Sequence, residues 1–293
     1  MQNEQLGVEL LDTAVLAVAV DDDGKVRSRA VVEAAGNLSA AVDAALAQMT
    51  SAAGTAVGVT TFNPEAPGVG EAAGTVAGRF GGPVMPSGVA AAVAETWVGA
   101  AKGANDVVYF AVADHAVAGI VRDGRAMRGA HGRAASVAWL PLNPVEREDY
   151  RKMGCLEAEV AALGIVRRLV WRIKAGDHSQ VLEIVDNDLT KITAEHVMTA
   201  ARAGDGVSIS VMRDTAKYLG MAAANLVLVI DPAVLVLGGI MADAADLLLE
   251  SVRTEIGRRL PRSMTDALTI ATATLGADAA AIGAARQADP SRR

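Results

Sequence analysis

The sequence has little cysteine and few aromatic residues. Cys155 is the single cysteine among 293 residues, which excludes an internal disulfide bond and a multi-cysteine zinc site. Aromatic residues make up 3% of the chain, whereas apolar residues, dominated by alanine and valine, make up 52%. Side chains this small predict helices and sheets that pack closely together.

The chain also lacks a long basic run and an apolar run of membrane-spanning length. Its formal net charge of −7 gives no electrostatic footprint for nucleic acid, so we expect no direct binding to DNA or RNA. The first residues show no charged leader followed by an apolar stretch and a cleavage site. We therefore expect a cytoplasmic protein with no membrane partner.

Two familiar catalytic motifs are missing as well. The sequence contains neither a Gly-x-x-x-x-Gly-Lys phosphate loop nor a Gly-x-Ser-x-Gly nucleophile elbow. The chain is nevertheless long enough for two domains that share a cleft and bury a large core.

Residues 107–142 carry the clearest secondary-structure pattern of the chain. Val107–Val112 and Ala116–Val121 are apolar and rich in β-branched residues, and an Asp-Gly pair at 123–124 follows them. This pattern predicts two strands joined by tight turns. Farther on, Gly129 and Gly132 flank His131, as expected where backbone approaches a ligand or turns a corner.

The N-terminal half alternates between strand and helix signals. Leu6–Val20 is predicted to be one strand that forms a hairpin with Lys25–Val32. Asn37–Met49 has the spacing of a helix with Asn37 as its cap, and Thr55–Thr61 is predicted to be another strand. Pro64–Gly82, rich in proline and glycine, is predicted to be a loop along the cleft.

The C-terminal half is mainly helical. The apolar spacing predicts one amphipathic helix over Glu157–Lys174 and further helices over Leu182–Asp186, Thr193–Ala203 and Gly206–Val229. Gly238 and Gly239 then end a buried strand that precedes a helix over Asp243–Leu260.

Several of these segments resemble the ROK family of bacterial repressors and sugar kinases. The resemblance is carried by residues 121–134 (VRDGRAMRGAHGRA), 231–240 (DPAVLVLGGI) and 275–284 (LGADAAAIGA). It implies an α/β, actin-like ATPase (ribonuclease H-like) fold with two domains around a cleft. A small N-terminal α/β domain would span residues 1–105 and be completed by a C-terminal helix at 277–293. A large α/β domain would span residues 106–276.

The two phosphate loops depart from the family pattern. Family members carry Asp-x-Gly-Gly-Thr where this chain has Glu9-Leu10-Leu11-Asp12-Thr13, and Gly-Thr-Gly-Ile-Gly where it has residues 113–117 (ADHAV). Leu11 and Asp12 remove backbone freedom and place a carboxylate where phosphate would lie. Only Thr13, and Glu9 as a carboxylate, could still contact phosphate or magnesium, or they are an ordinary exposed turn and strand end. Gly238 and Gly239 match the family's adenosine-side glycines, which implies cofactor binding, or they only begin the next helix.

The family's catalytic segment is also altered in Pro83–Glu95. In ROK kinases an asparagine there binds a sugar hydroxyl and the following aspartate takes the proton, and these positions correspond to Ser87 and Gly88. Glycine cannot accept a proton, and losing a positioned base typically costs about 10²- to 10⁴-fold in rate. We therefore predict no catalytic residue, with Gly88 at the usual aspartate position and Ser87 as a substrate contact.

Most of the family's zinc motif is missing. Trp139 stands at the histidine position, and only residues 154–157 (GCLE) remain of the cysteine segment, so we predict no zinc and no other metal site. Glu157 matches the family glutamate that binds sugar hydroxyls, or it is only a carboxylate near a helix start. His131 could contact a ligand or be a loop residue. A catalytic pair of Asp114 and His115 is not expected, since strand neighbours point to opposite faces.

The resemblance and its departures leave three hypotheses open. The first is a catalytically inactive pseudokinase that binds a sugar or nucleotide-type ligand or supports a partner subunit. The second is a weakly active ATP-dependent carbohydrate kinase in which Glu9, Asp12 or Asp114 replaces the missing groups. The third is a purely structural homo-oligomer. No cofactor is certain, residual ATP and magnesium binding is possible, and a homodimer or a heteromer with an active ROK protein is expected.

Overall fold

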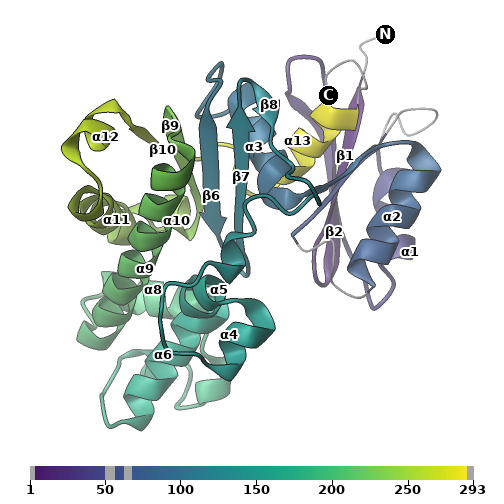
Figure 1. The fold of residues 1–293 in the computed structure, drawn as a ribbon. Helices are drawn as coiled ribbons and strands as arrows, with labels where there is room; N and C mark the ends of the chain where they lie inside the picture. Colours follow the sequence, from purple (N-terminus) through teal and green to yellow (C-terminus); the bar gives the residue numbers. More distant parts are fainter. Residues whose placement is uncertain (1–3, 50–56, 63–67, 289–293) are drawn as a thin grey trace.

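A computed structural model describes residues 4–49, 57–62 and 68–288. The described residues form two mixed five-stranded sheets that stand side by side in Figure 1, with strand orders β3-β2-β1-β4-β5 and β10-β9-β6-β7-β8. The strands of the first sheet are β1 (Gln5–Leu10), β2 (Ala14–Val20), β3 (Val26–Glu33), β4 (Val57–Thr61) and β5 (Val84–Pro86). Those of the second are β6 (Val107–Val112), β7 (Ala116–Arg122), β8 (Arg125–Ala126), β9 (Val234–Gly239) and β10 (Thr269–Thr272).

A tight turn, which the sequence pattern does not reveal, separates the first two strands of the first sheet. The single strand predicted over Leu6–Val20 is wrong, because β1 and β2 are separate antiparallel strands in which Leu10 faces Val15. Leu11 N–H donates to Ala14 C=O at 2.9 Å and closes the turn between them. Both strands are buried along their whole length, so no polar alternation marks where the chain reverses.

Of the two helices that cover the outer face of this sheet, one is predicted correctly from the sequence and the other is not. Helix α1 (Leu38–Ala47) begins after Asn37, whose side chain accepts from Ala40 N–H, as predicted. Helix α2 (Val69–Phe80) lies where a loop was predicted. Its buried Val69, Ala73 and Val76 pack with the core of the first sheet, so spacing outweighs the glycine content there. The predicted strand start at 55–56 and residues 63–67 lie outside the described residues.

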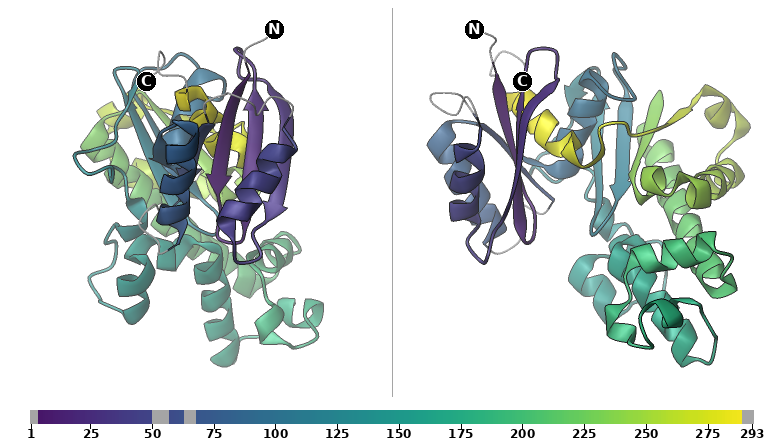
Figure 2. Two further views of the ribbon diagram at one scale, coloured as in Figure 1. Left: turned by 90° about the vertical axis from the view of Figure 1, so that its right-hand side faces the viewer. Right: turned by 180° about the vertical axis from the view of Figure 1, so that it is seen from behind.

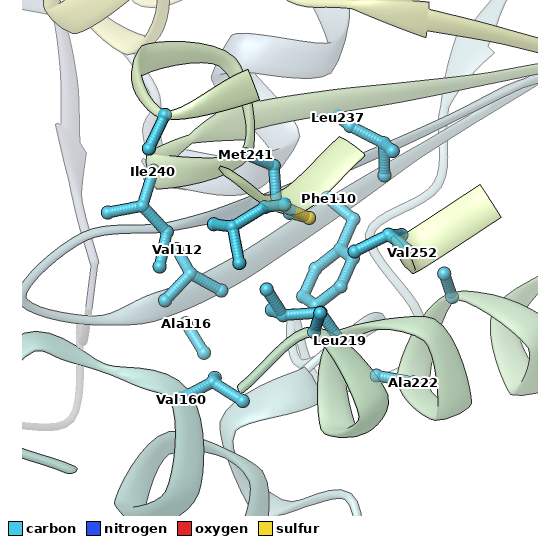
Figure 3. Close-up of a cluster of buried hydrophobic side chains, with 14 of the residues drawn as sticks. Phe110, Val112, Ala116, Val160, Leu219, Ala222, Leu237, Ile240, Met241 and Val252 are labelled. Carbon is cyan, nitrogen blue, oxygen red and sulfur yellow. The ribbon is translucent and has the colours of Figure 1, made fainter. Parts of the chain in front are cut away.

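The second sheet is centred on the predicted strand pair. Strands β6 and β7 pair antiparallel from Val107 opposite Val121 to Val112 opposite Ala116, which confirms the two-strand prediction. Strand β9 lies parallel to β6 on the other side. Phe110 of β6 is fully buried and packs among Leu219, Met241 and Val252, as Figure 3 shows.

Most of the helices accompany the second sheet. They are α4 (Glu148–Met153), α5 (Cys155–Val160), α6 (Ala162–Lys174), α7 (Val181–Ile184), α8 (Ala194–Arg202), α9 (Gly206–Ile230), α10 (Ile240–Asp243), α11 (Ala245–Arg259) and α12 (Arg262–Ala267). The prediction of one helix over Glu157–Lys174 is wrong, because Ala161 adopts an extended conformation, with ψ 165°, and separates α5 from α6. Ala162 N–H donates instead to Ala113 C=O at 3.0 Å, which ties the start of α6 to the turn between β6 and β7.

Two helices, α3 (Ser87–Trp97) and α13 (Ala279–Ala288), lie between the sheets. Helix α13 packs on β1, β2 and β4 of the first sheet, and α3 packs on β6 and β7 of the second. The two helices meet at Gly283, where an added Cβ would lie 1.8 Å from Ala90 O. None of the helices in the described ranges is long and apolar enough to span a membrane.

Candidate functional site

A cleft of about 590 Å³ opens where the two sheet regions meet. Phe62 and Pro86 line it from the side of the first sheet, and the turn that leads into β7 lines it from the other side. Residues 132–139 and helix α5 complete its wall. Apolar surface and a few converging polar groups in one concavity are typical of a small-molecule site.

His115 is held between two carboxylates that come from distant parts of the chain. Its Nε2 lies 2.8 Å from Asp12 Oδ2, in the turn between β1 and β2, and its Nδ1 lies 3.2 Å from Glu157 Oε1, on α5. The second oxygen of Glu157 accepts from Ala116 N–H at 2.9 Å, which fixes the carboxylate. The contact therefore joins a turn of the first sheet to the wall of the second.

The protonated form of His115 suits this position. Burial alone lowers its pKa, but the hydrogen bonds and charges of Glu157 and Asp12 outweigh burial, so the pKa lies above its usual value. An imidazolium ring donates from both nitrogens, whereas the neutral ring can donate to only one of the two carboxylates. Phe62 stacks on the same ring, with 3.6 Å between the ring centroids and 2° between the planes.

Glu9 and Ser87 form a second polar pair beneath the cleft. Ser87 Oγ donates to Glu9 Oε1 at 2.6 Å, and both residues are buried. Burial raises the pKa of Glu9 to about 7, although the hydrogen bond from Ser87 opposes that rise. Neither residue is among those that line the cleft, so the predicted substrate contact of Ser87 would require the cleft floor to move.

Gly88 is a packing position. An added Cβ would lie 2.2 Å from Ala118 O, which shows that α3 touches the backbone of β7 there. A side chain at this position would push the helix off the strand. The fold itself therefore gives a reason for glycine at 88, where the resemblance places the family's catalytic aspartate.

The predicted cofactor contacts Thr13, Gly238 and Gly239 are not among the residues that line the cleft. Thr13 is exposed in the turn between β1 and β2. Gly238 and Gly239 end β9, and an added Cβ on them would lie 2.7 Å from Tyr109 Oη and 2.0 Å from Val112 O, respectively. Gly239 has φ 58° and ψ −136°, a conformation open to glycine alone. It directly precedes the short helix α10, and the helix predicted over Asp243–Leu260 follows as α11.

The remaining predicted residues occupy different places. Glu157 lines the cleft, whereas His131 is exposed and is not among its lining residues, although the neighbouring Gly132 and Arg133 are. Trp139, at the family's histidine position, lines the cleft and is 54% exposed. Among the described residues, no group of three or more His, Cys, Asp or Glu side chains has the arrangement of a metal site.

Comparisons with known proteins agree with this architecture. The model of the ROK family matches residues 74–289. The chain belongs to the ROK family. It is 33% identical over 196 residues to a glucokinase of Halalkalibacterium halodurans (66% of this chain, 59% of the relative) and 30% identical over 176 residues to a xylose repressor of Caldicellulosiruptor bescii (58% and 42%). These matches span less than two thirds of either relative's length.

Solved structures of ROK proteins show the same fold. A ROK family glucokinase from Streptomyces griseus, in complex with glucose and AMPPNP, superposes with a TM-score of 0.82 at 25% identity and covers 96% of this chain and 98% of its own. A ROK hexokinase from Thermus thermophilus gives a TM-score of 0.72 at 25% identity and covers 96% and 97%. The chain thus has the predicted actin-like ATPase fold and is ROK sugar kinase-like.

Sequence reasoning missed His115 as a member of the site. Asp114 and His115 were treated as strand neighbours, but both lie in the turn before β7, where alternation does not apply. Phe62 was missed as well, although it directly follows the predicted strand that ends at Thr61. A possible signal was the position of both residues at strand ends, where actin-like folds gather their loops.

Proposed function

We propose that this chain is a carbohydrate-binding ROK protein that has lost efficient phosphoryl transfer. The observation that carries the proposal is the state of the carboxylate beneath the cleft. Glu9 is buried, hydrogen-bonded by Ser87 and absent from the cleft lining, while the adjoining Gly88 offers no side chain. A general base must reach the hydroxyl that it deprotonates, within hydrogen-bond distance or through one water.

The cleft offers the groups that a sugar needs. Glu157 can accept hydrogen bonds from hydroxyl groups, and His115 beside it can donate once a ligand displaces one of its carboxylate partners. Trp139 and Phe62 supply apolar surface for the C–H faces of a ring. A polyhydroxylated ligand of hexose size matches this mixture of carboxylate and aromatic surface.

The phosphate side of the cleft is unfavourable for ATP. Asp12 and Asp114 lie in the turns that follow β1 and β6, where the resemblance places the family's phosphate loops. The carboxylates of Asp12 and Glu157 already hold the His115 ring between them, so neither ring nitrogen is open to a phosphate oxygen. In the first turn, Leu11 N–H already donates to Ala14 C=O, so that amide is engaged within the protein. These features favour ligand binding without turnover.

One observation favours the alternative of a slow carbohydrate kinase. The pKa of Glu9, raised to about 7, is suited to a general base at neutral pH. In that case ligand binding would move the residues that cover Glu9 and Ser87, so that the Glu9 carboxylate reaches the sugar hydroxyl directly or through Ser87 Oγ. The two candidates differ in whether ATP is consumed, which can be measured directly.

The test combines a thermal-shift titration with a coupled assay for ADP. Purified protein is titrated with a panel of hexoses and N-acetylhexosamines, with and without ATP and magnesium, and ADP is followed in the same samples. Binding stabilises the folded state by mass action, so a ligand raises the melting temperature as its concentration passes Kd. The Glu157→Gln variant should raise the apparent Kd for the sugar by about tenfold, whereas the control Glu250→Gln, at an exposed position of α11, should leave it unchanged.

Three results are distinguishable. Stabilisation by a sugar that depends on Glu157, without ADP release, supports the proposal. ADP release that requires the same sugar supports the kinase alternative and overturns the proposal. No response to any sugar overturns carbohydrate binding and leaves a structural role as the remaining hypothesis.

A further inference from the structure

A second cavity, of about 930 Å³, lies at the opposite end of the second sheet from the cleft. The cleft meets β6 and β7 at the turn between Val112 and Ala116, whereas this cavity meets the other end of the pair, at Val121 and Gly124. Both residues of β8, Arg125 and Ala126, line this cavity, and β8 lies at the top of Figure 1, away from α5. It is therefore separate from the proposed sugar site.

Four cationic side chains line this cavity, which we call the basic pocket. They are Lys102, Arg125, Arg128 and Arg286, and the part of the chain that the structure describes contributes no aspartate or glutamate to its lining. This concentration of positive charge is unexpected in a chain whose formal net charge is −7. Within the described residues, the side chains of Lys102, Arg125 and Arg128 make no ion pair or hydrogen bond.

Two acidic residues that are close in sequence to the lining residues are engaged elsewhere, while Asp123 is exposed in the turn beside Gly124. Asp106 pairs with Arg122, with 3.2 Å between Oδ1 and Nε. Glu95, on the same helix as Trp97, is buried and accepts hydrogen bonds from the N–H groups of Ala100, Thr274 and Leu275. The positive charge of the pocket is therefore not balanced by these carboxylates.

The walls of the basic pocket are held in place by backbone hydrogen bonds. Gly103 N–H donates to Thr96 C=O at 3.0 Å, which ties the loop after α3 to the end of that helix. Gly124 N–H donates to Asn105 C=O at 3.0 Å, which ties the turn between β7 and β8 to the same loop. The guanidinium of Arg286, from α13, lies 4.5 Å from the centre of the Trp97 ring. Cations held on a fixed frame lose less entropy when they bind an anion.

We propose that the basic pocket binds a small, multiply charged phosphate compound. Arginine guanidinium groups form paired hydrogen bonds with phosphate oxygens, and lysine adds a point charge. Asn105, Thr96 and Gln287 line the same cavity and can serve the uncharged part of such a ligand. Inorganic pyrophosphate and a phosphorylated sugar share this chemistry, so the experiment below separates them.

Binding there would reach the cleft through one helix. Trp97 of the basic pocket lies in the last turn of α3, and Ser87, the partner of Glu9, is its first residue. Arg286 lies on α13, which packs along α3 and onto the first sheet. A ligand that joins Arg286 to Arg125 and Arg128 would therefore fix α13 relative to the strands of the second sheet.

Tryptophan fluorescence and thermal shift test the proposal on the intact chain. The probes are inorganic phosphate, inorganic pyrophosphate, a hexose 6-phosphate and the matching unphosphorylated hexose. We expect millimolar pyrophosphate or hexose phosphate to raise the melting temperature and change the emission of Trp97. Arg125→Gln with Arg128→Gln should weaken this binding by at least about tenfold. Rising salt should weaken it further.

Two further variants locate the effect. Lys174→Gln with Arg213→Gln removes the same charge from exposed positions on α6 and α9 and should leave binding unchanged. Trp97→Phe keeps an aromatic ring but should abolish the fluorescence change while the thermal shift persists. Asp12→Asn, in the cleft, should leave phosphate binding intact, which separates this proposal from the sugar site.

The probes also identify the source of the phosphate. A response to both pyrophosphate and hexose phosphate supports a general phosphate site, and a response to one alone supports the proposal and names that source. The absence of a response to every phosphorylated probe overturns it. An equal loss of binding in the Lys174→Gln, Arg213→Gln control also overturns it, because binding would then follow net charge alone.

Discussion

The junction between α3 and α13 and the cleft beside it are held together in different ways. At the junction, backbone touches backbone, and an added Cβ at Gly283 would lie 1.8 Å from Ala90 O. At the cleft, which encloses about 590 Å³, side chains from separate segments meet instead, as His115 does with Asp12 and Glu157. The junction fixes how the two sheets are placed, while the cleft can exchange polar groups without disturbing that placement. This contrast gives a physical reason why a chain can keep the ROK fold while polar groups in its cleft change.

The largest expected effect follows from filling the junction. Gly283→Ala should destabilise the protein by about 3 kcal/mol or more, since the new methyl group has no space and the helices must separate. Urea unfolding and soluble yield measure this loss.

The matched control is Gly257→Ala in α11. An added Cβ there meets nothing within 4 Å, so the change should stabilise the protein by about 0.5–1 kcal/mol through helix propensity. A Gly283→Ala variant as stable as the wild type would contradict the described junction.

The buried carboxylate beneath the cleft should produce the next largest effect. The pKa of Glu9 is raised from 4.5 to about 7, so the folded protein holds this proton to a higher pH than the unfolded chain does. The stability that protonation contributes is therefore present below about pH 4.5 and is lost as pH rises through 7. Glu9→Gln should remove this loss, and its advantage over wild type should grow by up to about 3 kcal/mol between pH 5 and pH 8.

Urea unfolding at several pH values measures the Glu9 effect. The control is Glu250→Gln, which removes an exposed carboxylate on α11 and so tests whether the effect depends on burial. A parallel pH dependence in wild type and Glu9→Gln would mean that Glu9 is ionised normally.

A smaller effect is expected at the polar bridge that His115 forms between Asp12 and Glu157. The pKa of His115 is raised by Glu157 and Asp12 against the effect of burial, so the bridge stabilises the fold at low pH and is lost as pH rises through the raised pKa. Asp12→Asn should lower the pKa of His115, as followed by NMR titration of the ring protons. Asp114→Asn changes a neighbouring exposed side chain and should leave that pKa in place; equal shifts in both variants would argue against the specific contact.

The smallest effect belongs to a contact within one element. Asn37→Ala removes the side chain that accepts from Ala40 N–H and should cost about 1 kcal/mol, as measured by thermal unfolding. Asn37→Ser retains a capping oxygen and should recover most of that loss. This local value sets the scale against which the junction and cleft effects are compared.

The fold was readable from the sequence where local rules apply. The β6–β7 pair and the Asn37 cap follow from β-branched runs and capping chemistry, which act over a few residues. The turn at Leu11–Thr13 was hidden because buried strands on both sides lack polar alternation. The break at Ala161 depends on a hydrogen bond from Ala162 to Ala113, far away in the sequence.

The site was less predictable than the fold for the same reason. Glu157 was found through its resemblance to family members, but its contact with His115 joins positions 42 residues apart. Asp12 reaches the same ring from 103 residues away. Gly88 was interpreted as a missing catalytic group, whereas its packing against Ala118 depends on how α3 meets β7. Such contacts arise from tertiary structure, which residue spacing alone does not specify.

The most direct test of the proposed function is a single-turnover experiment with protein in excess over radiolabelled ATP. The sugar that gives the largest thermal shift is present at saturation, together with magnesium, so slow product release cannot mask the chemical step. The account predicts that this sugar remains bound and that no phosphorylated sugar forms within the period in which a ROK glucokinase control converts all of its ATP. Formation of one equivalent of sugar phosphate would contradict the account and support the carbohydrate kinase alternative.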